Sequence, residues 1–171
     1  MILGMPTYTF VHVVISLVAI AAGLIVLYGF LSSRRYPFIN AVFLIVTILT
    51  CLTGFGFPFV QLLPSHIVGI ITLVFSIIAV IALYGRKLAG RWRWIYVVSA
   101  GIALYLNVFV LVVQAFQKVP ALNALAPTGS EPPFKVVQIV VLAAFALLTL
   151  IGAVRFRPFA QGPGFPRARQ H

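Results

Sequence analysis

Two histidines are the side chains of this sequence best suited to chemistry in an apolar environment. His12 and His66 each stand at the beginning of a long apolar stretch, and the chain has only one acidic residue, Glu131. A neutral imidazole can ligate haem iron, form hydrogen bonds through both nitrogens and exchange protons near neutral pH. We therefore expect any redox or proton chemistry of this protein to depend on His12 and His66.

Several amides and lysines could assist these histidines. They lie in the later apolar stretches, and all except one are close to a stretch end. Side-chain amides can hydrogen-bond haem propionates or a quinone ring, and a lysine can neutralise a propionate. The expected cofactor-binding set is His12, His66, Asn107, Gln114, Gln117, Lys118, Lys135 and Gln138.

Four functions remain open from these residues, one of them the handling of lipids or small solutes. In the first, His12 and His66 are the two axial ligands of the iron of one haem b. In the second, the same histidines and amides form a pocket for the head group of a quinone, without haem. Both imply a small membrane subunit linked to electron transfer. The alternative is a cofactor-free accessory or assembly subunit of a larger membrane complex, in which the histidines and glutamines join helices by hydrogen bonds.

Other chemistries are excluded or disfavoured by the composition. With no aspartate and a single glutamate, catalysis by paired carboxylates is excluded, and no set of catalytic residues is recognisable. Glu131 could complete a metal site with the two histidines, but Lys135 lies one helical turn on, so a Glu131–Lys135 ion pair is expected instead. Nucleic acid is not an expected partner, because the basic residues lie in short connections between apolar stretches.

The elements that must position the histidines are membrane-spanning helices. The chain has 171 residues, of which 63% are hydrophobic and 8% charged, whereas a soluble domain has roughly 25% charged residues. Apolar stretches of about 20 residues, the length that crosses a bilayer, are predicted at 8–31, 38–57, 66–84, 94–116 and 134–154. We expect an all-α, integral membrane bundle of five transmembrane helices, forming one domain over residues 1–171.

The distribution of positive charge predicts the orientation of this bundle. All Lys and Arg except Lys118 and Lys135 follow the first, third or fifth stretch. Because positive residues are retained in the cytoplasm, the N-terminus is expected outside and the C-terminus inside. The segment 155–171 is then a flexible basic cytoplasmic tail. We expect a multi-pass protein of a bacterial inner membrane, with lipids and other membrane subunits as partners.

Two further patterns bear on the site. His12 to Tyr28-Gly29 resembles His66 to Tyr84-Gly85, which suggests a parallel duplication of a two-helix hairpin. Polar residues gather toward the extracytoplasmic ends of the first, third, fourth and fifth stretches, so we expect these four helices to surround an outward-facing pocket. Residues 120–125 are expected to form a short helix over its mouth.

Overall fold

Prolines mark where several helices begin. Pro37, Pro120 and Pro132 each occupy the first turn of a helix, where a missing backbone N–H leaves no helical hydrogen bond unmade. The computed structural model describes residues 6–56 and 64–157. In this part of the chain all regular structure is helical: α1 (Thr7–Leu31), α2 (Pro37–Gly54), α3 (Pro64–Val80), a π-helical turn η1 (Ile81–Gly85), α4 (Trp92–Lys118), α5 (Pro120–Leu125) and α6 (Pro132–Arg155).

The five predicted spans are confirmed as helices that are long and apolar enough to cross a membrane. The predicted ends are close to the observed ones, except that α2 ends at Gly54 and not at residue 57. Residue 57, the predicted break after it up to residue 63, and positions 158–171 of the predicted tail lie outside the described residues. The predicted short helix at 120–125 is confirmed as α5.

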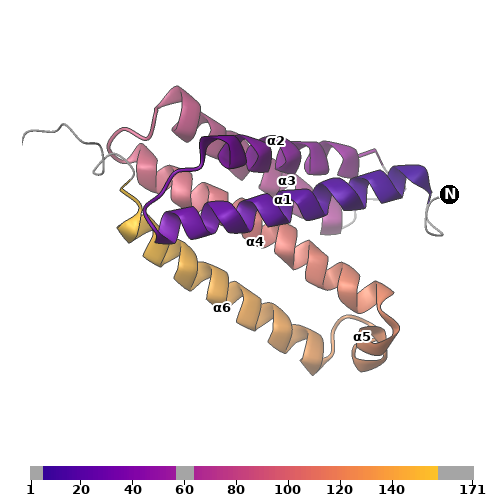
Figure 1. Cartoon of the computed structure of the whole chain (residues 1–171). Coiled ribbons are helices and arrows are strands. Elements are labelled where there is room, and N and C mark those ends of the chain that lie inside the picture. The colour runs from indigo at the N-terminus through magenta and orange to yellow at the C-terminus, as the bar shows by residue number, and fades with distance from the viewer. Residues whose placement is uncertain (1–5, 57–63, 158–171) are drawn as a thin grey trace, which may run out of the picture.

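The helices form a four-membered ring with a fifth helix beside it. Helices α1, α2, α3 and α4 each pack on the next, and α4 also packs on α1; α6 packs on α1 and α4 (Figure 1). The chain alternates between two ends of this bundle. We call the end with the connections 32–36 and 86–91 the basic end, and the end with His12, His66 and α5 the histidine end.

The expected arrangement of polar helix ends is corrected by this topology. The sequence placed the first, third, fourth and fifth spans around one centre, without the second. In the structure α2 packs against both α1 and α3, whereas α6 packs against α1 and α4. The hydrophobic pattern of each span identifies a buried face but not the helix that covers it, and this is why the neighbours were assigned incorrectly.

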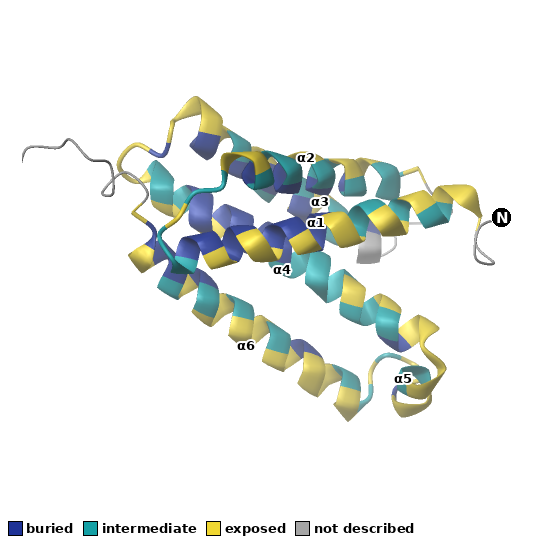
Figure 2. Cartoon of the chain, in the orientation of Figure 1, coloured by how far each residue is buried: buried dark blue, intermediate teal, exposed yellow. Residues whose placement is uncertain are grey.

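The closely packed core lies in the basic half of the bundle (Figure 2). Buried residues of α1 all fall within 19–30, and those of α4 fall within 96–104 except for Phe116. On α6 they fall within 149–153 except for Gln138. The other halves of α1, α4 and α6 are exposed or half-buried within the protein itself.

Glycines bring the helices together in this half. A methyl group on Gly152 of α6 would lie 2.9 Å from Phe30 Cβ of α1, and one on Gly23 would lie 2.8 Å from Phe43 Cε2. Small residues of this kind allow membrane helices to approach closely and gain dispersion contacts. The ring of Phe30 then packs edge-on against that of Tyr96, with centroids 5.4 Å apart.

Candidate functional site

Both histidines lie against the end of α2. On α1, His12 Nδ1 is 2.8 Å from Thr53 Oγ1. On α3, the ring of His66 stacks on that of Phe55, with centroids 6.2 Å apart and planes inclined by 18°. Residues 53–55 therefore contact an imidazole on each side, and they bring the two predicted site residues into one structural unit.

The hydrogen bonds of Thr53 favour one tautomer of His12. The Thr53 hydroxyl donates its only hydrogen to the carbonyl oxygen of Leu49, 2.8 Å away, one turn back along α2. With its hydrogen on the Leu49 carbonyl, Thr53 Oγ1 accepts a hydrogen bond from His12, and this arrangement favours the tautomer with the hydrogen on Nδ1. Nε2 of the neutral ring consequently has the lone pair, which is the arrangement of a histidine that ligates a metal or accepts a hydrogen bond.

Tyr8 attaches the first turn of α1 to the same point. Its hydroxyl donates to the backbone carbonyl of Thr53 at 2.5 Å, one of the last carbonyls of α2 that lack a partner in an ideal helix. Ser16, one turn after His12, donates to the His12 carbonyl at 2.6 Å. No residue of α1 before Ala19 is buried, so polar contacts with α2 contribute strongly to the position of this half of the helix.

Two glycines show where the rings lie on the helices. A Cβ atom on Gly54 would lie 3.7 Å from His12 Cε1, and one on Gly69 would lie 3.5 Å from Phe55 Cζ. The His12 ring thus lies over the backbone of α2, and the Phe55 ring over that of α3. His66 itself is buried, with 6% of its surface exposed.

Asn107 lies deeper in the bundle. Its Nδ2 donates to Thr47 Oγ1 at 3.5 Å, between α4 and α2, and Thr47 is fully buried. Thr47 precedes Thr53 by six residues, which is about 9 Å along a helix. Asn107 therefore joins two helices of the ring below the histidines.

Gln138 joins α6 to α4. Its Nε2 donates to the backbone carbonyl of Phe109 at 3.3 Å, and the side chain is 9% exposed. Its Oε1 is buried without a partner among the described residues. Because α6 packs on α1 and α4, Gln138 belongs to an interface on the side of the ring.

The remaining predicted site residues lie on the surface at the histidine end. Gln114, Gln117, Lys118 and Lys135 are all exposed. The structure thus unites His12 with His66, and it places the two buried amides in separate helix interfaces. Sequence reasoning missed Tyr8, Thr53 and Phe55. The sequence Thr53-Gly54-Phe55 did signal a helix end, but nothing in it showed which side chains would meet there.

The only carboxylate organises the connection between α5 and α6. Glu131 Oε1 accepts hydrogen bonds from the backbone N–H and the hydroxyl of Thr128, at 3.0 and 2.9 Å, and Oε2 accepts one from the Ser130 N–H at 2.9 Å. The hydrogen bond from the Thr128 N–H is the largest influence, and it lowers the pKa of the Glu131 carboxyl. The expected ion pair with Lys135 is not formed, because these nearer donors satisfy the carboxylate.

The arrangement positions the His12 imidazole against the end of α2 and stacks the His66 ring on Phe55. It does not include a protein-only metal site: within residues 6–56 and 64–157 no three His, Cys, Asp or Glu side chains are grouped to hold an ion. No protein-family model, no curated protein and no solved structure matches this chain.

Proposed function

We propose that this protein is a membrane subunit of an electron-transfer system and that its histidine end binds the head group of a quinol. The observation that supports this most directly is the hydrogen bond between His12 and Thr53. It orients a neutral imidazole with the lone pair on Nε2, and such a nitrogen accepts a hydrogen bond from a quinol hydroxyl. The reduced ligand, which has two hydroxyl groups, is therefore preferred to the quinone.

The surroundings of His12 support a ring-shaped ligand. Tyr8 bonds to the carbonyl of the same Thr53 that contacts His12, and two residues further on the Phe55 ring stacks on that of His66, a second polar group. Pockets for such ligands combine mostly apolar walls with a few placed polar groups. In this proposal the protein binds and orients the quinol, His12 Nε2 accepts the hydroxyl proton, and a haem or iron–sulfur centre in a partner subunit accepts the electrons.

The haem form is less well supported than the quinol form. Ligation by both imidazoles requires the two rings to reach one iron atom. Each ring is instead in contact with residues 53–55 of α2, which a macrocycle between the rings would have to displace.

We further propose that the basic end faces the cytoplasm of a bacterial inner membrane, with the N-terminus outside. Among the described residues, every Lys and Arg other than Lys118 and Lys135 belongs to the basic end. Retention of positive residues in the cytoplasm supports this orientation. The quinol site would then open toward the extracytoplasmic side.

A binding titration with matched variants tests the quinol site. The purified protein, in nanodiscs, is titrated with a short-chain ubiquinol under anaerobic conditions, and Thr53→Val is compared with Thr50→Val. Both threonines bond to the carbonyl four residues back, but only Thr53 contacts His12. We expect Thr53→Val and His12→Ala to weaken quinol binding about tenfold, as the loss of one well-placed hydrogen bond would, and Thr50→Val to leave it unchanged.

The other outcomes separate the alternatives. A Soret band with a dithionite-reduced α band in the purified protein, lost in His12→Ala and in His66→Ala, would replace the quinol proposal by the haem b form. Absence of both quinol binding and haem, in a protein that purifies only with partner subunits, would leave the cofactor-free accessory subunit.

A further inference from the structure

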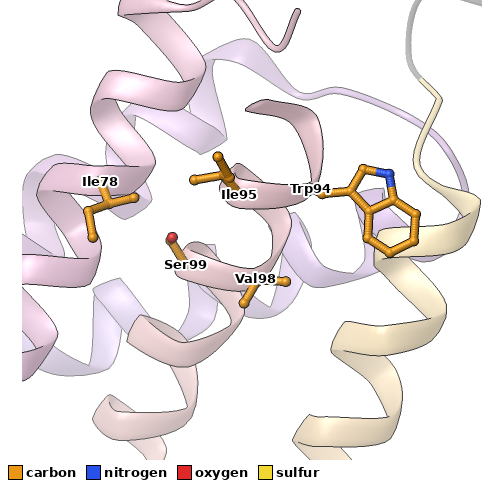
Figure 3. A pocket seen from close by; sticks show the side chains of 5 residues that line it. All are labelled: Ile78, Trp94, Ile95, Val98 and Ser99. Carbon is orange, nitrogen blue, oxygen red and sulfur yellow. The ribbon is translucent and has the colours of Figure 1, made fainter. Parts of the chain in front are cut away.

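A shallow apolar groove runs between α3 and α4 at the basic end (Figure 3). Its volume is about 380 Å³, and it is lined by Ile78 of α3 and by Trp94, Ile95, Val98 and Ser99 of α4. Figure 3 shows Ile78 facing Ile95 and Ser99 across the groove, with Trp94 projecting on the other side of α4. Ser99 has the only hydroxyl in this lining, and the other side chains are apolar, so the groove is suited to contact hydrocarbon chains.

A guanidinium stands at the interfacial end of the same helix face. Arg91, Trp94, Ile95 and Val98 are spaced three, four and seven residues apart, so they form one stripe along α4. Arg91 is exposed, and its backbone carbonyl accepts the Ile95 N–H at 3.2 Å, which places it at the start of the helix. The positive charge of Arg91 therefore lies about one helical turn before the apolar residues that line the groove.

The α3–α4 connection adds two more positive charges at this end. Two backbone hydrogen bonds hold this connection in place: Arg86 N–H donates to the Ile81 carbonyl at 2.8 Å, and Leu88 N–H donates to the Ala82 carbonyl at 3.0 Å. The Leu88 side chain is buried, with 3% of its surface exposed. Arg86 and Lys87 remain exposed, with Arg86 Cζ 5.0 Å from the centre of the Trp92 ring. The only acidic residue, Glu131, lies at the opposite end of the bundle.

We infer that this groove binds one anionic phospholipid of the adjacent leaflet. An acyl chain lies along Ile78, Ile95 and Val98, and the phosphate group is held by Arg91 and Arg86. Arginine binds phosphate oxygens through several N–H groups at once. The charge complementarity is specific to an anionic head group, because no carboxylate is present here to balance the arginines. This site is separate from the quinol site and does not depend on it.

The two tryptophans of the chain, Trp92 and Trp94, allow a direct test. In the Trp92→Phe protein, Trp94 is the only tryptophan, and it lies on the turn of α4 that borders the groove, with its ring beside the groove. This variant is placed in nanodiscs of phosphatidylcholine with an increasing fraction of lipid brominated on its acyl chains, either phosphatidylglycerol or phosphatidylcholine. Bromine quenches a tryptophan that it contacts, so the mole fraction that half-quenches Trp94 reports how readily each lipid occupies the surface beside the groove, and comparison with Val98→Phe isolates the contribution of the groove.

We expect brominated phosphatidylglycerol to half-quench Trp94 at a mole fraction several-fold lower than brominated phosphatidylcholine. Arg91→Gln should reduce this preference about fivefold, the contribution of one basic side chain near an anionic surface. Val98→Phe, which fills the groove and changes no charge, should remove it. Arg34→Gln is the matched control, since Arg34 is equally exposed at the same end but belongs to the α1–α2 connection.

Three results would overturn the inference. The first is equal quenching by the two lipids. The second is an effect of Arg34→Gln as large as that of Arg91→Gln, with none from Val98→Phe, because this pattern describes diffuse attraction to the whole basic end. The third is a dimer in the nanodisc whose Trp94 is shielded from both lipids, because a second copy of the chain would then cover the groove. Circular dichroism of Val98→Phe checks that a lost preference does not come from misfolding.

Discussion

Thr53→Val separates the role of one hydroxyl from everything else at the histidine end. Valine has nearly the shape of threonine, so the packing of α2 is kept and only Oγ1 is lost. The hydrogen bond from Tyr8 to the Thr53 carbonyl involves the backbone and survives the change. What disappears is the acceptor 2.8 Å from His12 Nδ1.

The expected destabilisation is small but measurable. A hydrogen bond contributes a net 0.5–1.5 kcal/mol, roughly, in proteins, and interhelical ones in a membrane average about 0.6 and reach about 1.7 kcal/mol. We therefore expect Thr53→Val to lower the free energy of unfolding by about 1 kcal/mol. Unfolding by sodium dodecyl sulfate in mixed micelles, followed by tryptophan fluorescence, measures this. Thr50→Val removes a hydroxyl bonded only within α2, to Val46 O at 2.9 Å, and should change stability by a few tenths of a kcal/mol.

The tautomer of His12 gives a second and more specific readout. With Thr53 in place the neutral ring carries its hydrogen on Nδ1; without it, that preference should disappear. Nitrogen-15 NMR distinguishes the two forms, and the chain has only three histidines, so a His12→Asn spectrum assigns the signal. An unchanged tautomer in Thr53→Val, together with a stability equal to that of Thr50→Val, would refute the role given to Thr53.

Two further predictions concern packing and pH. Gly152→Ala should destabilise the bundle by about 1–3 kcal/mol, because the new methyl group would lie 2.9 Å from Phe30 Cβ. Gly85→Ala is the control in the same unfolding assay, and it should be tolerated because its methyl group would lie 3.7 Å from the nearest atom. Hydrogen bonds lower the pKa of the Glu131 carboxyl in the folded protein. The ionised carboxylate therefore stabilises the α5–α6 connection fully above the pKa of the unfolded chain, about 4.3. This stabilisation is lost as the pH falls through the lower pKa of the folded protein. The protection factor of the Thr128 amide, which is the intrinsic exchange rate at each pH divided by the observed rate, should therefore fall in this acidic range. A Glu131→Gln protein that kept the same acid dependence of protection would contradict this.

The helices could be predicted from the sequence because each depends on local properties. Long apolar runs specify membrane helices, and the residues that interrupt them specify the connections. The prediction was least accurate where local signals conflict. Pro37 was assigned to a connection, yet proline is well suited to the first turn of a helix, and α2 begins there. Pro132 was expected to fit the first turn of the last span, and α6 begins at this residue. Gly54 ends α2 three residues earlier than its apolar run suggested.

The candidate site could be predicted only in part, because its geometry is tertiary. His12 and His66 were correctly identified as residues of one end, since their positions along the helices follow from the sequence. Their contacts depend on α2, and no periodicity in the sequence shows that the end of α2 meets both rings. Thr53 was overlooked because a threonine in an apolar helix usually bonds to its own backbone, as Thr53 also does.

The contrast between the two halves of the bundle has a mechanical consequence for the histidine end. From Ala19, where burial of α1 begins, back to Thr7 the helix is about 18 Å long, so a tilt of about 5° moves its tip by roughly 1.6 Å. A displacement of this size is enough to break the bonds from Tyr8 and His12 to Thr53, so a slight reorientation of α1 in the membrane would be converted into an on–off change in the contacts around His12.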